Sequence, residues 1–191
     1  MVNDPTKERL VSATVRLLRE KGPSGTGTAQ ILTEAGAQRG SLYFHFPAGK
    51  DELVRAAVQD WGLQTAEVIR GVFDEPIGLP ERVERYFEVV ARGLLGDEFR
   101  YGCAVGATTL DLAAGSADVR ALTGEVFDSW TEAVADHLRA GGIEEARAAA
   151  LATALIAGAE GATMLARAKQ DLEPVHATGR MLAAATREAL R

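Results

Sequence analysis

Apolar residues recur every three or four positions along most of the chain, which is the spacing of an amphipathic α-helix. The clearest stripe runs from Val54 to Val72 and predicts one long helix from about Gly49 to Phe73. The same spacing predicts further helices over residues 83–94, 104–114, 119–138, 144–169 and 174–190. No run alternates apolar and polar residues as a half-buried strand does, so the predicted fold class is all-α.

Residues that start or stop helices fall between these stripes. Asp4 followed by Pro5 is typical of a helix start, because Asp accepts hydrogen bonds from free N–H groups and Pro suits the first helical position. Gly22 is expected to end this first helix, and Gly141-Gly142 to end a later one. The breaks therefore agree with the periodicity.

Residues 26–50 predict a short helix, a tight turn and a second short helix. Thr26 is expected to cap the first of these helices, and Gly36 to turn the chain in a left-handed conformation. Two small helices joined by such a turn are the unit that places one helix in the major groove of DNA. The segment therefore indicates a DNA-binding protein.

The second short helix is expected to present polar side chains to the DNA and to anchor itself through Leu42, Phe44 and Phe46. Polar side chains at this position bind base edges or phosphates. The DNA-binding candidates drawn from these residues are Gln38, Arg39, Ser41, Tyr43, His45 and Lys50. The alternatives are solvated charges at Arg39 and Lys50, a packing role for the Tyr43 ring, and a surface or core position for His45.

Residues 36–46 (GAQRGSLYFHF) closely resemble the signature of TetR-type transcriptional regulators. Residues 47–53 and Thr26-Gly27 are similar to the subgroup of LmrA-type repressors, as are residues 102–105 and the region around Trp130. The resemblance extends over nearly the whole chain. It implies an N-terminal three-helix helix-turn-helix DNA-binding domain, expected at residues 1–48. A C-terminal helical bundle for ligand binding and dimerisation is expected at residues 49–191.

One departure from the family's pattern concerns the first short helix. Many members carry Thr and a polar or basic residue where Gly27 and Ala29 stand in this sequence. Thr28 therefore becomes the candidate DNA contact from this helix.

The resemblance also implies a ligand-responsive repressor that binds a palindromic operator as a homodimer and is released by a small hydrophobic, often aromatic, inducer. The inducer would bind in the C-terminal domain, where several aromatic and soft side chains fall on separate helices. The residues expected to line this site and face the middle of the bundle are Phe87, Phe127, Trp130 and Met164, with Asp111, Glu160 and Thr163 as polar partners. On periodicity alone, aromatic residues at this spacing are more often part of an ordinary core.

Charge is divided unevenly along the 191 residues, whose net charge is −6. Residues 1–50 carry seven Lys or Arg and four Asp or Glu, a net charge of +3, which leaves −9 for the remaining 141 residues. A basic start and an acidic remainder concentrate attraction for phosphate on the helix-turn-helix segment. Ordinary scatter of surface charge is the alternative.

Eleven alanines and two glycines lie between Ala146 and Ala168. Small side chains let helix backbones approach closely, so this helix and the last one are expected to form a four-helix contact across a two-fold axis. A homodimer of this kind places two recognition helices on a palindrome. The alternative is that the alanines fill a bundle within one chain.

Other chemistry is sparse. Cys103 is the single cysteine and is expected to be a packing thiol, and His137 and His176 have no partners at metal spacing, so no metal or cofactor is predicted. No phosphate loop, nucleophile elbow or histidine–acid constellation indicates an enzyme. No stretch is expected to be long and apolar enough for a membrane span, which favours the cytoplasm. A helical interaction module without an operator and an activator of the same fold remain as alternatives.

Overall fold

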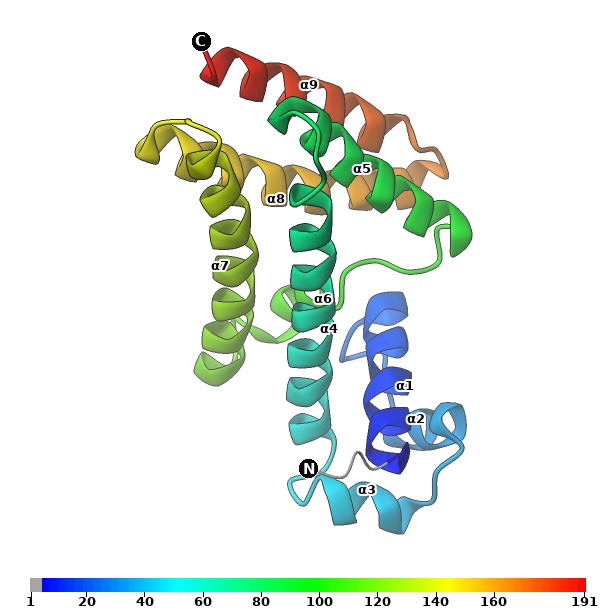
Figure 1. The fold of residues 1–191 in the computed structure, drawn as a ribbon. Coiled ribbons are helices and arrows are strands. Elements are labelled where there is room, and N and C mark those ends of the chain that lie inside the picture. Colours follow the sequence, from blue (N-terminus) through cyan, green and yellow to red (C-terminus); the bar gives the residue numbers. More distant parts are fainter. Residues whose placement is uncertain (1–4) are drawn as a thin grey trace. The chain divides into compact units, whose positions relative to one another are not determined.

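The computed structural model describes residues 5–191, and in this range the chain consists of α-helices without a strand. This confirms the all-α prediction, while the predicted cap Asp4 lies outside the described residues. Figure 1 shows the helices in chain order. They are α1 (Pro5–Lys21), α2 (Thr28–Ala35), α3 (Arg39–His45), α4 (Lys50–Phe73), α5 (Leu79–Gly96), α6 (Ala104–Leu112), α7 (Ala117–Ala140), α8 (Glu145–Lys169) and α9 (Glu173–Ala189).

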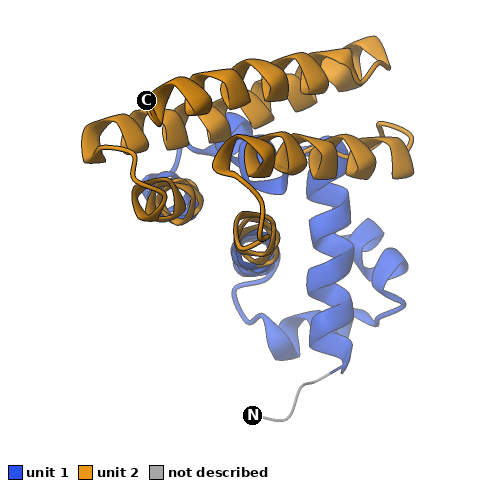
Figure 2. Ribbon diagram, turned by 45° about the horizontal axis from the view of Figure 1, so that its top comes forward, with its two compact units in different colours: residues 1–63, 103–126 blue, residues 64–102, 127–191 orange. Residues whose placement is uncertain are grey.

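The helices divide into two compact units, coloured separately in Figure 2. Unit 1 comprises residues 1–63 and 103–126, and unit 2 comprises residues 64–102 and 127–191. Unit 1 thus contains α1–α3 together with α6 and the adjoining parts of α4 and α7. Packing units need not coincide with functional domains, so the division predicted between residues 48 and 49 stays a prediction.

Unit 1 is built on a small apolar core shared by α1, α2, α3 and the start of α4. Leu10, Ile31, Leu42 and Leu53 each come from a different helix, and none is exposed to solvent. On the other side α6 packs against α1. Because apolar burial is the main force holding such a small unit together, these side chains fix the positions of the short helices α2 and α3.

Unit 2 is organised around α9, which packs along both α5 and α8 (Figure 1). Glycines allow the close approach of these helices. A Cβ atom added at Gly179 of α9 would lie 2.7 Å from Cβ of Phe87, and one at Gly158 of α8 would lie 3.1 Å from Cδ1 of Leu182. Phe87 is 1% exposed as a result, and it forms the centre of the contact among the three helices.

The N-terminus of α8 is capped by Glu144, whose side chain accepts hydrogen bonds from the backbone N–H groups of Ala146 and Arg147 at 3.0 and 3.1 Å. These hydrogen bonds favour the charged carboxylate and hold the pKa of Glu144 below its ordinary value. A carboxylate at this end also interacts favourably with the helix dipole.

One face of α8 is not covered by other helices of unit 2. The side chains exposed along it include those of Ala150, Ala154, Ala157, Met164 and Leu165. Met164 is 59% exposed, so the expectation that it faces the middle of the bundle is wrong. Periodicity failed here because small and large apolar residues lie on both sides of α8: alanines with Leu155 and Ile156 on the packed side, and alanines with Met164 and Leu165 on the exposed side.

By length and composition α8 is apolar enough to cross a membrane, since an 18-residue window has a mean hydropathy of 1.5. The expectation that no stretch reaches this level is therefore wrong. A third of that window is buried inside the structure, where α8 packs against α5 and α9. Many of its residues are alanines, which give a high hydropathy and permit close helix packing at the same time.

Candidate nucleic-acid interface

The turn between α2 and α3 depends on Gly36, which has φ 56° and ψ 40°. This left-handed conformation is the one predicted, and it costs glycine least because glycine has no Cβ atom. The turn is closed by a hydrogen bond from the backbone N–H of Ala37 to the carbonyl of Leu32 at 2.9 Å. The chain thereby reverses within a few residues and begins α3 at Arg39.

The start of α2 differs from the prediction. Gly27 occupies the N-cap position, without a side-chain hydrogen bond, and Thr26 is buried. The Thr26 hydroxyl instead donates to the carbonyl of Gly22 at 2.7 Å and so stabilises the turn after α1. Thr26 therefore does not cap α2, because the helix begins one residue later than a cap at Thr26 requires and the N-cap position falls on Gly27. Thr28, the candidate DNA contact, is half-buried at the first position of α2.

Two apolar residues anchor α3, not three. Leu42 is completely buried and Phe46 is 2% exposed, as predicted, but Phe44 is 79% exposed. The expected inward orientation of Phe44 is therefore wrong. The reason is helical geometry: residues four apart share a face, whereas a residue midway between them lies about 200° around the helix.

The polar candidates on α3 differ in exposure. Gln38, Arg39 and Tyr43 are exposed, whereas Ser41 is half-buried. We call the three exposed residues the recognition face; Arg39 and Tyr43 are four positions apart and therefore share one side of the helix. The ring of Tyr43 lies close to the backbone at Gly49, where an added Cβ would be 3.4 Å from the ring atom Cε1, and 47% of Tyr43 remains exposed. Three of the four predicted DNA contacts on α3 are thus accessible to solvent.

The remaining two candidates have partners within unit 1. His45 is half-buried and meets Phe44 edge-on, with 4.9 Å between the ring centroids. The Lys50 ammonium donates to the carbonyl of Pro23 at 2.8 Å. Lys50 therefore ties the start of α4 to the turn after α1, and an ammonium has further N–H donors beyond the one used here.

Asp111 contacts this same turn from the other side. It lies on α6 within unit 1, and its Oδ2 accepts a hydrogen bond from the backbone N–H of Ser24 at 3.0 Å. A Cβ at Gly22 would lie only 2.7 Å from that oxygen. Asp111 was predicted as a polar partner for a ligand; its observed partner is the turn after α1. No local pattern marks this contact, because the two residues are 87 positions apart.

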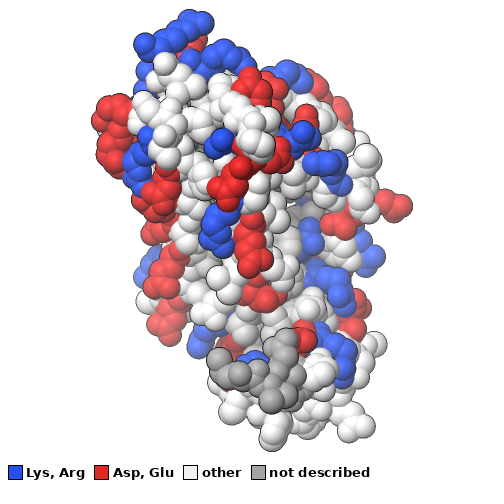
Figure 3. Space-filling model, viewed as in Figure 1, with Lys and Arg blue, Asp and Glu red and all other residues white. Residues whose placement is uncertain are grey.

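Charged and aromatic contacts hold the rest of unit 1. Arg16 of α1 pairs with Glu34 of α2 at 3.1 Å, and the guanidinium of Arg19 lies 4.3 Å from the ring centroid of Trp61. Such exposed ion pairs contribute little individually, about 0–1 kcal/mol. On the face that Figure 3 shows, acidic and basic side chains are interspersed without a large area of one sign.

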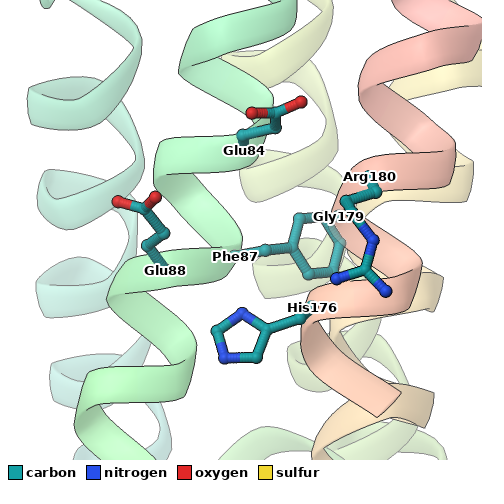
Figure 4. A pocket seen from close by; sticks show the side chains of 6 residues that line it. All are labelled: Glu84, Phe87, Glu88, His176, Gly179 and Arg180. Atoms are coloured by element: carbon teal, nitrogen blue, oxygen red, sulfur yellow. The ribbon is translucent and has the colours of Figure 1, made fainter. Parts of the chain in front are cut away.

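The predicted ligand residues that lie in unit 2 come from three helices, α5, α7 and α8. Phe127 and Trp130 meet edge-on on α7, with 5.4 Å between their ring centroids, and Trp130 is 2% exposed. Glu160 and Thr163 are half-buried on α8. Phe87 instead points from α5 toward Gly179 of α9, as Figure 4 shows.

Phe87 forms the floor of a surface groove between α5 and α9 with a volume of about 200 Å³ (Figure 4). Its other lining residues are Glu84, Glu88, His176, Gly179 and Arg180. Mostly charged side chains thus surround the ring. Among the described residues, no group of His, Cys, Asp or Glu is arranged to hold a metal ion.

Two protein-family models match parts of this chain. The family model described as "Bacterial regulatory proteins, tetR family" matches residues 10–57. The model for the C-terminal domain of LmrA/YxaF-like transcriptional regulators matches residues 80–181. These two matches include α2, α3 and most of unit 2.

Individual relatives are similar to this chain over most of its length and of their own. An uncharacterised HTH-type transcriptional regulator of Mycobacterium tuberculosis is 33% identical over 92% of this chain and 91% of its own. The HTH-type transcriptional regulator LmrA of Bacillus subtilis is 28% identical over 89% and 90%. The crystal structure of a regulatory protein TetR from Rhodobacter sphaeroides superposes with a TM-score of 0.86 at 27% identity, covering 95% of this chain and 99% of that one.

Proposed function

Because this chain belongs to the TetR family of bacterial transcriptional regulators and has an LmrA/YxaF-like C-terminal domain, we propose that it is a ligand-responsive repressor. In this proposal a homodimer binds a palindromic operator in the cytoplasm and is released by a small hydrophobic or aromatic inducer. The chain acts by binding and carries out no catalysis.

The observation that carries the proposal is the recognition face of α3. Gln38, Arg39 and Tyr43 are exposed, while the buried side chains of Leu42 and Phe46 anchor the helix. An α-helix fits the major groove, and these side chain types donate or accept hydrogen bonds with base edges and phosphates. In the proposal Thr28, Ser41, His45 and Lys50 support the contact from its margins.

The uncovered face of α8 supports the homodimer. Its exposed alanines, with Met164 and Leu165, leave an apolar surface that a second copy of α8 and α9 would bury. On α9, Met181 is 66% exposed. Small side chains permit the close approach that a four-helix contact requires. Two-fold symmetry then gives a palindromic operator, with recognition helices roughly 34 Å apart.

The ligand response is the least localised part of the proposal. The edge-on pair of Phe127 and Trp130 is the strongest remaining candidate for an aromatic-binding surface, with Glu160 and Thr163 as polar partners. Small-molecule sites are usually apolar with a few polar groups. Ligand binding must favour one spacing of the two recognition helices over the other, since equal affinity for both would shift nothing.

Operator binding is tested by selecting duplexes from a random pool and titrating the enriched site against salt. We expect a palindromic site whose affinity falls linearly on a log–log plot. Arg39→Ala should weaken binding by about tenfold or more, and Arg92→Ala, an exposed arginine on α5, should leave it unchanged. An Arg39→Ala protein with wild-type affinity would remove Arg39 from the interface.

Dimerisation is tested by sedimentation of Ala157→Glu. Ala157 is exposed within one protomer, so the variant should fold but become monomeric and lose operator affinity. Ala121→Glu introduces the same charge at an exposed position of α7 and should remain dimeric. If Ala157→Glu also remained dimeric, the contact would not involve this face of α8.

A further inference from the structure

Phe44 is the most exposed of the large apolar side chains in the described part of the chain, at 79%. Its ring contributes nothing to the core of unit 1, since Leu42 and Phe46 already anchor α3. Leaving a phenylalanine in water forgoes a substantial hydrophobic gain. An exposed aromatic residue on the helix proposed to enter DNA therefore calls for a partner that contacts it only in the complex.

The surroundings of Phe44 leave its ring accessible. Gly40 lies one helical turn earlier on the same side, and a Cβ added there would meet nothing within 4 Å. The ring of His45 contacts Phe44 edge-on, with an angle of 82° between the ring planes. An edge contact restrains the ring without covering its faces. Phe44 therefore stands on open helix surface next to Tyr43 of the recognition face.

The chemistry of the major groove limits what a phenyl ring can bind there. Base edges present hydrogen-bond donors and acceptors, and the apolar exception is the C5-methyl group of thymine. A phenyl ring cannot satisfy the donors or acceptors, but it can bury the methyl. We infer that Phe44 determines sequence specificity by packing against a thymine methyl in each half-site of the operator. This inference rests on the proposed function.

The inference is tested on the duplex selected from the random pool. Each thymine is replaced by deoxyuridine, which removes the methyl group and keeps every hydrogen-bonding group. Wild-type protein should lose about fourfold in affinity when the contacted thymine of one half-site is changed, the factor expected for one buried methyl group. Changing both half-sites should cost about 15-fold.

Phe44→Ala should bind the thymine and deoxyuridine duplexes at that position equally well. Because the ring is exposed, its removal should not lower the stability of the free protein, which urea unfolding checks. Leu110→Ala removes a side chain that is 75% exposed on α6 of the same unit, and it should retain the wild-type preference for thymine.

The outcomes separate this inference from the proposed function. If wild-type protein binds its selected duplex but Phe44→Ala keeps the full sensitivity to deoxyuridine, another residue reads the methyl and the inference is wrong. Indifference of the wild-type protein to every deoxyuridine replacement overturns it equally. If no duplex is enriched and binding is the same for all sequences, the proposed function itself fails.

Discussion

Replacing Gly179 with alanine tests the close packing that holds α9 in unit 2. The added Cβ would lie 2.7 Å from Cβ and 3.0 Å from Cγ of Phe87. Carbon atoms in contact normally lie 3.5–4.0 Å apart. Cβ of Phe87 is attached directly to the backbone, so a rotation of the side chain cannot remove the clash, and α5 and α9 must move apart.

Two opposing terms set the size of the effect. Alanine is favoured over glycine in a helix by about 0.5–1 kcal/mol. Overpacking a filled interior costs about 1–3 kcal/mol. The clash is with atoms close to the backbone, so we expect the second term to dominate and Gly179→Ala to lower the free energy of unfolding by about 1–2 kcal/mol.

Gly93→Ala is the matched control, because a Cβ at this exposed position of α5 would meet nothing within 4 Å. At this position only the higher helix propensity of alanine changes the stability, so the free energy of unfolding of the variant should rise by up to about 1 kcal/mol. Urea unfolding of both variants is followed by circular dichroism at one protein concentration, since dimerisation would make stability depend on concentration. The close approach of α5 and α9 would be refuted if Gly179→Ala gained stability as Gly93→Ala does.

Three further predictions concern other contacts. Asp111→Ala should increase hydrogen exchange at the Ser24 amide and lower stability by about 0.5–1 kcal/mol, whereas unchanged exchange would show that the bond is unimportant. The Glu144 cap contributes stability above the pKa of the unfolded state, and this contribution is lost as the pH falls through the lower folded pKa. Glu144→Gln should therefore reduce the loss of unfolding free energy that the wild-type protein shows below about pH 4.5. If the variant lost as much unfolding free energy in acid as the wild type, this prediction would be contradicted. Because Trp130 is buried, Trp130→Ala should lower the free energy of unfolding by about 3–5 kcal/mol. The milder Trp130→Phe is therefore the variant in which to measure release from DNA by aromatic compounds. A dose–response like that of the wild type would count against a role of Trp130 in ligand binding.

The helices α4, α7 and α8 could be predicted from the sequence to within one or two residues at each end. The predicted helix from Gly49 to Phe73 is observed as Lys50–Phe73, and the one over residues 144–169 as Glu145–Lys169. In these helices many apolar residues follow the same three-to-four spacing, and residues typical of helix ends mark their limits. The left-handed turn at Gly36 was predictable for a different reason, since few other residues adopt that conformation.

Side-chain partners were harder to predict because they depend on residues distant in the chain or on competition among nearby groups. The hydrogen bond between Asp111 and Ser24 joins segments 87 positions apart, and no local pattern contains it. Thr26 is able to cap a helix, but α2 begins after Gly27, and the Thr26 hydroxyl donates to the carbonyl of Gly22 in the preceding turn. Sequence indicates which groups are able to bond, whereas the fold decides which of them meet.

The two errors about apolar residues both concern side chains that the structure leaves exposed. Phe44 and Met164 were both expected to face inward, and they are 79% and 59% exposed. A hydrophobic pattern predicts that a side chain will be buried. It does not distinguish burial in the core of the same chain from burial against a binding partner. Phe44 lies on the helix proposed to bind DNA, and Met164 on the face proposed to meet a second protomer. Both of these side chains therefore coincide with a proposed interface, which is the expected relation if those surfaces are selected for binding.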